Sequence, residues 1–143
     1  MQSTRRILIV DQSALFRATL ARYLALLDAG YEVVGEAATD EAALLASARL
    51  QPQIVLIDLD LPDRSGLGTT RDIRSHWPGI AVVAVTNHFD REYCAAALAA
   101  GAQNCLDKLA LVERLPAVLA AIRSDTPLLP NDEVGLARPY EPP

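Results

Sequence analysis

The sequence lacks the features that mark membrane proteins and nucleic-acid-binding proteins. No apolar run approaches the roughly 20 residues that cross a bilayer, and the short apolar stretch near the start lacks the cleavage site of a signal peptide. The net charge is −5 and the basic residues are scattered singly, whereas a nucleic-acid-binding surface needs a basic stripe. We therefore expect a cytoplasmic protein that binds neither membrane nor nucleic acid.

Aromatic residues and cysteines are both scarce. The aromatic fraction is 5%, which suits helices packed on a sheet better than an all-β sandwich. The two cysteines, Cys94 and Cys105, lie among apolar or small residues, without CxxC spacing and without a nearby pair of histidines. We expect two reduced core thiols rather than a disulfide or a metal site.

The length and the distribution of prolines define the domain organisation. A chain of 143 residues fits one domain with a core of useful size. Five prolines follow residue 124 in a stretch of low periodicity. The sequence therefore predicts one domain over residues 1–124 and an extended or disordered Pro-rich tail over residues 125–143.

Strand-like and helix-like patterns alternate five times along the domain. The expected strands are residues 7–10, 31–37, 54–58, 80–85 and 104–107. Several are continuous apolar runs, which is typical of strands buried on both faces of a parallel sheet. With right-handed crossovers, this alternation predicts an α/β fold with a doubly wound parallel sheet and helices on both faces.

Capping residues predict where the intervening helices begin and end. Ser13, Asp40 and Asp90 can each cap the start of a helix, and Gly30 can end the first one. Pro116 is acceptable in the last helix only if it lies in the first turn, where its missing N–H has no helical partner.

The third expected strand delivers a carboxylate to its carboxyl end. Ile54 to Ile57 run directly into Asp58, and ligands of open α/β sheets bind in the crevice beyond such strand ends. Pro62 and the Ser65-Gly66 pair then turn the chain away and leave the acid uncovered. Asp58 is therefore a candidate reacting group.

The other strand ends present chemically matched side chains. Asp11 and Gln12 follow the first strand, Thr86 follows the fourth and Lys108 follows the fifth. Together these groups suit phosphoryl transfer to the Asp58 carboxylate. A Mg²⁺ ion held by oxygen ligands would offset the negative charge, while Lys108 and the Thr86 hydroxyl would bind the phosphoryl oxygens.

Four motifs in this order resemble the response-regulator receiver domain of two-component signalling. They are ILIVDQS, IVLIDLDLPDRSG, VVAVTN and CLDK, and the resemblance covers about residues 5–124. It implies a flavodoxin-like, five-stranded parallel sheet with strand order 2-1-3-4-5.

The resemblance also implies a role for each matching residue. Asp58 would be the phosphoacceptor and a metal ligand, and Asp11 an acidic-pocket residue that also holds the metal. Asp60 would bind Mg²⁺ through its backbone carbonyl. Thr86 would be the switch hydroxyl and Lys108 the lysine that binds the phosphoryl group.

Partners follow from the same resemblance. A histidine kinase and an unidentified output protein are implied, and no enzyme activity is expected. The segments YEVVGEA and NHFDREY look most like a subfamily that usually carries a helix-turn-helix output domain, which we expect to be absent from this chain. A homodimer is left open.

The sequence departs from the family pattern at four positions. Gln12 stands where a second acid usually ligates the metal, so it predicts weak Mg²⁺ binding. Cys105 replaces the usual aromatic residue of the fifth strand, whose ring moves with the switch hydroxyl. Leu109 replaces a frequent proline, and Pro116 would shorten or bend the last helix.

Two other functions compete with a phosphorylated receiver. A degenerate receiver that acts without phosphorylation is favoured by Gln12 and Cys105. A phosphatase of the haloacid-dehalogenase type would use Asp58 and Asp60 as its DxD motif, with Thr86 and Lys108 as later motif residues. In that superfamily, however, DxD usually lies on the first strand and an acidic motif follows the lysine.

The remaining polar residues also have simpler, non-catalytic interpretations. His88 could influence dephosphorylation, or it could be an exposed loop residue with no role in the site. Asp60, Asp63 and Asp107 are by default solvated loop charges, although Asp60 could also face the pocket. Trp77 at a helix end is expected to be a packing anchor.

Overall fold

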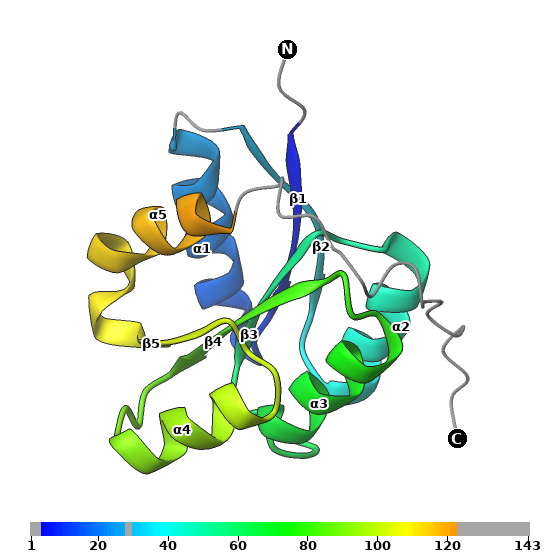
Figure 1. Ribbon diagram of the computed structural model, residues 1–143. Coiled ribbons are helices and arrows are strands. Elements are labelled where there is room, and N and C mark those ends of the chain that lie inside the picture. The colour runs from blue at the N-terminus through cyan, green and yellow to red at the C-terminus, as the bar shows by residue number, and fades with distance from the viewer. Residues whose placement is uncertain (1–3, 28–29, 123–143) are drawn as a thin grey trace.

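The chain folds into one parallel sheet covered by helices on both faces (Figure 1). The structure is a computed structural model that describes residues 4–27 and 30–122. The sheet has five strands in the order β2-β1-β3-β4-β5, and all neighbouring pairs are parallel. This confirms the predicted doubly wound α/β fold and its strand order. The predicted tail over residues 125–143 lies outside the described residues.

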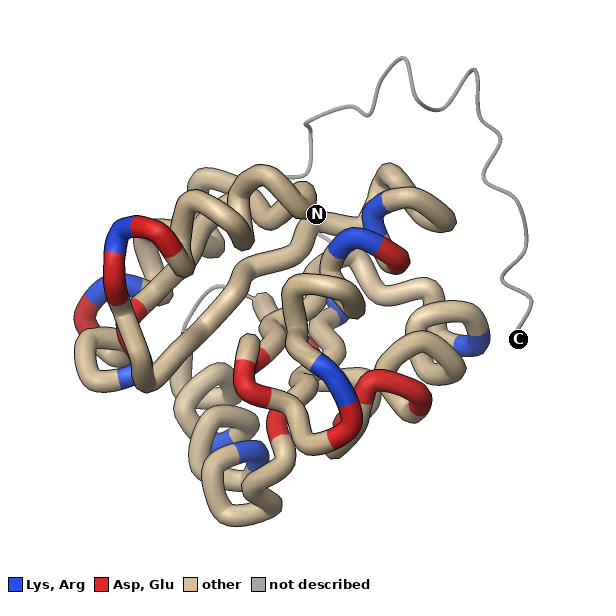
Figure 2. The backbone as a smooth tube through the Cα atoms, turned by 90° about the horizontal axis from the view of Figure 1, so that it is seen from below, with Lys and Arg blue, Asp and Glu red and all other residues tan. Residues whose placement is uncertain are grey.

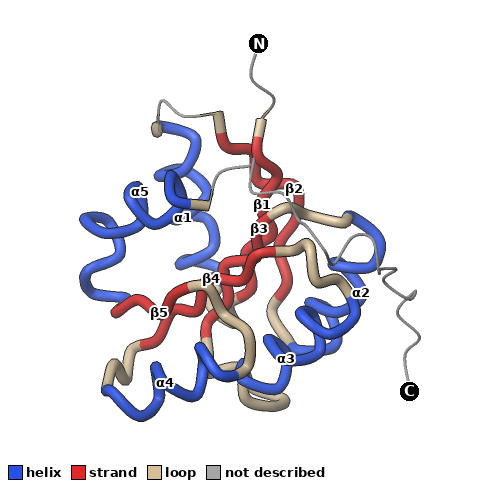
Figure 3. The backbone as a smooth tube through the Cα atoms, in the orientation of Figure 1, coloured by secondary structure: helices blue, strands red, loops and turns tan. Residues whose placement is uncertain are grey.

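Strands and helices alternate along the whole described chain (Figure 3). The strands are β1 (Arg5–Val10), β2 (Tyr31–Ala37), β3 (Ile54–Asp58), β4 (Ala81–Thr86) and β5 (Asn104–Asp107). The helices are α1 (Ala14–Leu26), α2 (Asp40–Leu50), α3 (Gly66–His76), α4 (Arg91–Ala99) and α5 (Leu111–Ala121), with the short 3-10 helix η1 (Lys108–Ala110) before α5.

Two hydrophobic cores lie on opposite faces of the sheet. Side chains of α1 and α5 pack on one face, and side chains of α2, α3 and α4 pack on the other. Successive residues of β1 and β3 alternate between the two cores: Ile7 and Ile54 face α1 and α5, whereas Leu8 and Val55 face α2 and α3. All five residues of β3 are buried, which explains the absence of polar alternation in this strand.

The register of the sheet brings the strand ends to one edge. Val10 of β1 pairs with Ile57 of β3, Asp58 pairs with Val85 of β4, and Thr86 pairs with Asp107 of β5. Because all strands are parallel, the residues that follow them share the same end of the sheet.

Two of the predicted caps are confirmed, and two other helix boundaries differ from the prediction. The side chains of Ser13 and Asp90 accept hydrogen bonds at the starts of α1 and α4. The cap of α2 is Thr39 rather than Asp40, because the Thr39 hydroxyl accepts the Ala42 N–H and leaves Asp40 in the first turn. Helix α1 ends at Leu26, before Gly30.

Pro116 lies inside α5, not in its first turn as predicted. Proline has no N–H to donate to the carbonyl of Val112, which is four residues earlier. The Tyr23 hydroxyl of α1 donates to that carbonyl instead, at 2.7 Å. A side chain from the neighbouring helix therefore replaces the missing backbone hydrogen bond.

The prediction of two reduced thiols is wrong. Cys94 of α4 and Cys105 of β5 form a disulfide, and their Cα atoms lie 5.5 Å apart. The spacing of eleven residues carried no disulfide signal, because the two positions meet only when α4 packs on β5. Trp77 is buried as predicted, with 5% of its surface exposed.

Charged residues are spread over several elements of the described chain (Figure 2). The Lys and Arg positions, blue in that view, fall on the start of β1, on several helices and on loops rather than along one element. In the described part of the chain, no helix is long and apolar enough to cross a membrane.

Candidate functional site

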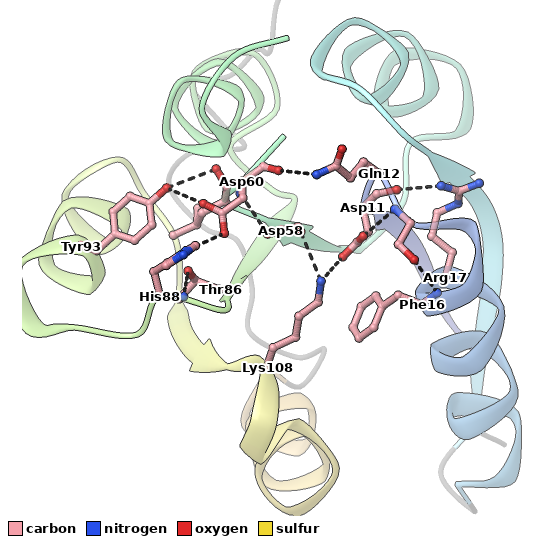
Figure 4. A network of polar contacts seen from close by, with 12 residues as sticks. Asp11, Gln12, Phe16, Arg17, Asp58, Asp60, Thr86, His88, Tyr93 and Lys108 are labelled. Carbon is pink, nitrogen blue, oxygen red and sulfur yellow. Dashed lines mark hydrogen bonds and ion pairs between the residues drawn. The ribbon is translucent and has the colours of Figure 1, made fainter. Parts of the chain in front are cut away.

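The predicted site residues meet at the carboxyl edge of the central strands (Figure 4). Asp58 ends β3, Asp11 and Gln12 follow β1, Thr86 ends β4, and Lys108 follows β5. Four segments that are distant in the sequence thus contribute to one cluster, as the strand-end argument predicted.

Asp58 is a buried carboxylate with two defined contacts. It is 4% exposed, its Oδ1 accepts the Asp60 N–H at 2.9 Å, and its Oδ2 lies 3.3 Å from the Lys108 ammonium. Burial raises the pKa of Asp58 above 3.8 and the charge of Asp11 raises it further, although the Asp60 N–H and Lys108 act in the opposite direction. Keeping the Asp58 carboxylate ionised in the folded chain therefore costs free energy.

Lys108, the only lysine of the chain, lies between the two buried carboxylates. Its Nζ is 2.7 Å from Asp11 Oδ2 and 3.3 Å from Asp58 Oδ2. Burial alone would lower its pKa, but the hydrogen bond to Asp11 and the charges of Asp58 and Asp11 outweigh burial and raise it above 10.5. Lys108 is therefore a fixed cation in the site at neutral pH.

The aromatic ring of Phe16 also contacts the Lys108 ammonium group. Lys108 Nζ lies 4.0 Å from the centroid of the Phe16 ring, a distance at which the aromatic face attracts an ammonium group. The sequence pattern identified Phe16 only as an apolar position of α1. Its contact with Lys108 joins residues that are far apart in the sequence, so no local signal could have revealed it.

Asp11 is held by the turn between β1 and α1. Its Oδ1 accepts the Ser13 N–H at 2.8 Å, and its backbone carbonyl accepts a hydrogen bond from Arg17 at 2.7 Å. Arg17 also pairs with Glu36 of β2 at 2.9 Å. The carboxylate of Asp11 is thereby fixed toward Lys108, and Arg17 is a supporting residue that the sequence analysis missed.

Asp60 presents two different groups to the site. Its backbone carbonyl accepts a hydrogen bond from the Gln12 amide at 3.4 Å. Its side chain lies 3.4 Å from His88 Nδ1 and 3.4 Å from the Tyr93 hydroxyl. Gln12 thus faces the pocket, and His88 and Tyr93 connect the loop after β3 with the segment around α4.

Thr86 is fully buried at the end of β4. Its Oγ1 accepts the backbone N–H of His88 at 2.9 Å. The hydroxyl oxygen is therefore tied to its own loop as an acceptor, and a hydroxyl that accepts one hydrogen bond can still donate its O–H to a phosphoryl oxygen.

The loop after β3 is anchored on two sides. A Cβ at Gly66 would lie 2.6 Å from the carbonyl oxygen of Asp58, so only glycine allows α3 to begin this close to the strand. On the other side, Asp63 accepts the backbone N–H of Asp40, the first residue of α2, at 2.8 Å. This bond lowers the pKa of Asp63, which is exposed but is not the purely solvated charge that we expected.

Asp107 likewise has a structural contact, because its side chain accepts the Leu109 N–H at 3.0 Å and caps η1. Leu109 itself is 89% exposed.

The donor set of the site consists of hard oxygen atoms. Within residues 4–27 and 30–122, no group of three or more His, Cys, Asp and Glu side chains is placed to hold a metal ion. The oxygens at hand are the carboxylates of Asp11 and Asp58, the carbonyl of Asp60 and the amide of Gln12. Such atoms suit a hard cation, and they lie beside a cation suited to phosphoryl oxygens.

Comparisons with known proteins agree with this geometry. Residues 7–120 match the family model of the response regulator receiver domain. The response regulator GacA of Pseudomonas protegens is 37% identical over 126 residues, which are 85% of this chain and 59% of that protein. A protein-glutamate methylesterase/protein-glutamine glutaminase of Geobacter metallireducens is 40% identical over 72% of this chain and 30% of its own length.

Solved structures show the same fold. The signal receiver domain of the putative response regulator NarL from Mycobacterium tuberculosis superimposes with a TM-score of 0.77 and 28% identity, and covers 85% of this chain and 98% of that one. The chain spans about half the length of the curated relatives it matches. The family match, the relatives and the strand-end cluster together place this chain in the family of response-regulator receiver domains.

Proposed function

We propose that this chain is the phosphoacceptor receiver of a two-component system and that Asp58 accepts the phosphoryl group from a histidine kinase. The observation that carries the proposal is the arrangement of two buried carboxylates, Asp11 and Asp58, around one ammonium group. Lys108 lies 2.7 Å from the first and 3.3 Å from the second. An ionised carboxylate beside a fixed cation provides a nucleophile and a binding group for the transferred phosphoryl oxygens.

The same atoms provide a site for Mg²⁺. The carboxylates of Asp11 and Asp58 and the Asp60 carbonyl would hold the ion, with the Gln12 amide oxygen as a weak fourth ligand. The amide would have to turn, because its nitrogen now donates to the Asp60 carbonyl. When bound, the ion would neutralise negative charge shared by the nucleophile and the phosphoryl oxygens.

In the transfer step, an Asp58 oxygen forms a bond to phosphorus while the P–N bond of the donor phosphohistidine breaks. The electrons of that bond leave with the imidazole. Lys108 then pairs with a phosphoryl oxygen, and the Thr86 hydroxyl donates its O–H to another. Because the oxygen of the same hydroxyl accepts the His88 N–H, a movement of Thr86 toward the phosphoryl group would reach the loop that leads into α4.

The signal would leave this chain through contacts with another protein in the cytoplasm. A domain that stores its signal as an acyl phosphate must pass it to a partner that binds one state better than the other. We therefore propose an output protein as the second partner, with no catalytic turnover by this chain.

A degenerate receiver is the second candidate, and Gln12 favours it. The amide removes a negative charge from the expected metal site and already binds the Asp60 carbonyl. If this contact persists in solution, the chain would bind its partners without phosphorylation.

The experiment is incubation of the full chain with Mg²⁺ and acetyl phosphate, followed by intact mass measurement. The proposal predicts a gain of one HPO₃ group that is lost when EDTA replaces Mg²⁺. A parallel assay with p-nitrophenyl phosphate should show no multiple turnover, whereas sustained hydrolysis would identify a phosphatase of the haloacid-dehalogenase type. A chain that gains no HPO₃ at any Mg²⁺ concentration would be a degenerate receiver.

A further inference from the structure

The disulfide between Cys94 and Cys105 lies in the part of the site that links the phosphoacceptor to α4. Cys105 pairs with Ala84 on β4, two residues before Thr86, and it precedes Lys108 by three residues. Cys94 follows Tyr93, whose hydroxyl contacts the Asp60 side chain. The covalent bond therefore joins α4, which carries Tyr93, to β5, which leads directly into Lys108.

Helix α4 is attached to the core at few points besides the disulfide. Of its nine residues only Ala97 is buried, whereas five of the eleven residues of α2 are buried. Tyr93 and Cys94 pack partly against the core, and the Tyr93 hydroxyl donates to the Leu59 carbonyl at 3.3 Å. The bond to Cys105 is therefore one of a small number of contacts that fix the position of this helix.

The pair is placed to react with small thiols and disulfides. Cys94 is half-buried and Cys105 is 9% exposed, so Cys94 is the more accessible residue of the pair. The Cα separation of 5.5 Å is typical of a disulfide, so the bond can form without moving the backbone. In a reducing compartment, a disulfide is usually transient and catalytic or redox-sensing.

We propose that Cys94 and Cys105 form a reversible thiol–disulfide switch that controls the freedom of α4. In the oxidised chain the bond holds α4 on β5. In the reduced chain α4 is released, and its response to a phosphoryl group on Asp58 becomes larger. This second effect rests on the proposed function, whereas the release of α4 does not.

The redox reaction is a two-electron thiol–disulfide exchange. The Cys94 thiolate attacks a low-molecular-weight disulfide, which forms a mixed disulfide and releases one thiol. The Cys105 thiolate then attacks the Cys94 sulfur, forms the internal bond and releases the second thiol. Two thiols of the chain are oxidised as one external disulfide is reduced, and an external dithiol reverses the process.

The test begins with the full chain in buffers of varied glutathione to glutathione disulfide ratio. After acid quenching and alkylation, intact mass should show one reversible step between zero and two alkylated cysteines. Chains that stay alkylated on both cysteines at every ratio would overturn the proposal, and so would chains linked to each other through disulfides.

Amide exchange then measures the freedom of α4 without phosphorylation. Residues 91–100 should exchange about tenfold faster or more in the reduced chain, which corresponds to about 1.4 kcal/mol. The variant Cys94→Ala should exchange like the reduced chain in both buffers, and Cys105→Ala provides a second variant. Equal exchange in the oxidised and reduced wild type would overturn the switch.

The last arm adds Mg²⁺ and acetyl phosphate to both redox forms. Labelling should change the exchange of residues 91–100 more in the reduced chain than in the oxidised one. Equal changes would overturn the coupling to phosphorylation. If neither form is labelled, the proposed function fails, while a redox effect on α4 in the unlabelled chain still supports the switch.

Discussion

At the residue scale, the site depends on a single ammonium group placed between two buried carboxylates. Lys108 cancels part of the repulsion between Asp11 and Asp58, and the Phe16 ring holds it in position. The same positive charge repels a metal ion and attracts phosphoryl oxygens. The effect of removing Lys108 should therefore have opposite signs on these two ligands.

Lys108→Ala should slow labelling of Asp58 by about 10²-fold, the size typical of losing one group that stabilises transition-state charge. Magnesium affinity should stay unchanged or increase, because the repelling cation is gone. Labelling kinetics and Mg²⁺ titration measure the two effects, with Lys108→Arg as the variant that retains the charge. Equal losses in both measurements would show that Lys108 is only structural.

The stability of an Asp58 variant should depend on pH. The raised pKa of Asp58 means that its contribution to stability is complete below about 3.8, the value in the unfolded chain, and is lost as the pH rises through the folded value. Asp58→Asn removes the ionised form while Lys108 keeps Asp11 as its partner. The free energy of unfolding should thus increase on the order of 1 kcal/mol at neutral pH.

Denaturant titrations at pH 7 and near pH 4 measure this difference, which should shrink in acid. Asp72→Asn is the control, because it removes a half-exposed carboxylate on the surface of α3. An advantage for Asp58→Asn that is the same size at both pH values would contradict the assignment of burial as its cause.

Gln12 determines how strongly the site holds magnesium. Two unit charges interact by roughly 4 kcal/mol at about 4 Å and an effective dielectric of ~20, and desolvation cancels much of this. Gln12→Asp should therefore tighten Mg²⁺ binding on the order of 10- to 100-fold and speed labelling, while it lowers metal-free stability. Parallel Mg²⁺ titrations decide this, since equal affinities would mean that position 12 does not contact the ion.

At the element scale, α5 tolerates an internal proline because α1 supplies a replacement hydrogen bond. The Tyr23 hydroxyl donates to the Val112 carbonyl, which Pro116 leaves without a backbone donor. The interaction also joins two helices that cover the same face of the sheet.

Tyr23→Phe should lower the free energy of unfolding by about 0.5–1.5 kcal/mol, the value of one hydrogen bond. In a Pro116→Ala background, the restored N–H can bond to Val112, so the same change at Tyr23 should cost less. A double-mutant cycle by denaturant unfolding measures this coupling. An identical cost in both backgrounds would show that the Tyr23 hydroxyl does not replace the helical bond.

At the scale of the whole molecule, local sequence patterns were sufficient to predict the fold. Each buried strand is an apolar run, and parallel strands place Asp11, Asp58 and Thr86 at one edge without any knowledge of tertiary contacts. Right-handed crossovers then predict a doubly wound parallel sheet, whereas the strand order came from the resemblance to the receiver family.

Apart from the local cap of α2, the features that escaped prediction depend on contacts between separate segments. Cys94 and Cys105 meet only when α4 packs on β5, and Phe16 reaches Lys108 across almost the whole domain. Asp63 binds the first N–H of α2 although it follows β3 in the chain. None of these pairs has a characteristic spacing, so a single sequence carries no signal for them.

The most direct test of Asp58 as the phosphoacceptor is the intact mass of three proteins after incubation with Mg²⁺ and acetyl phosphate. The wild type should gain one HPO₃ group. Asp60→Asn should gain it as well, because the backbone carbonyl of residue 60 is retained. Asp58→Asn should gain none while it stays folded, because an amide keeps the shape of the carboxylate but is not a nucleophile. The same gain in Asp58→Asn as in the wild type would contradict the assignment.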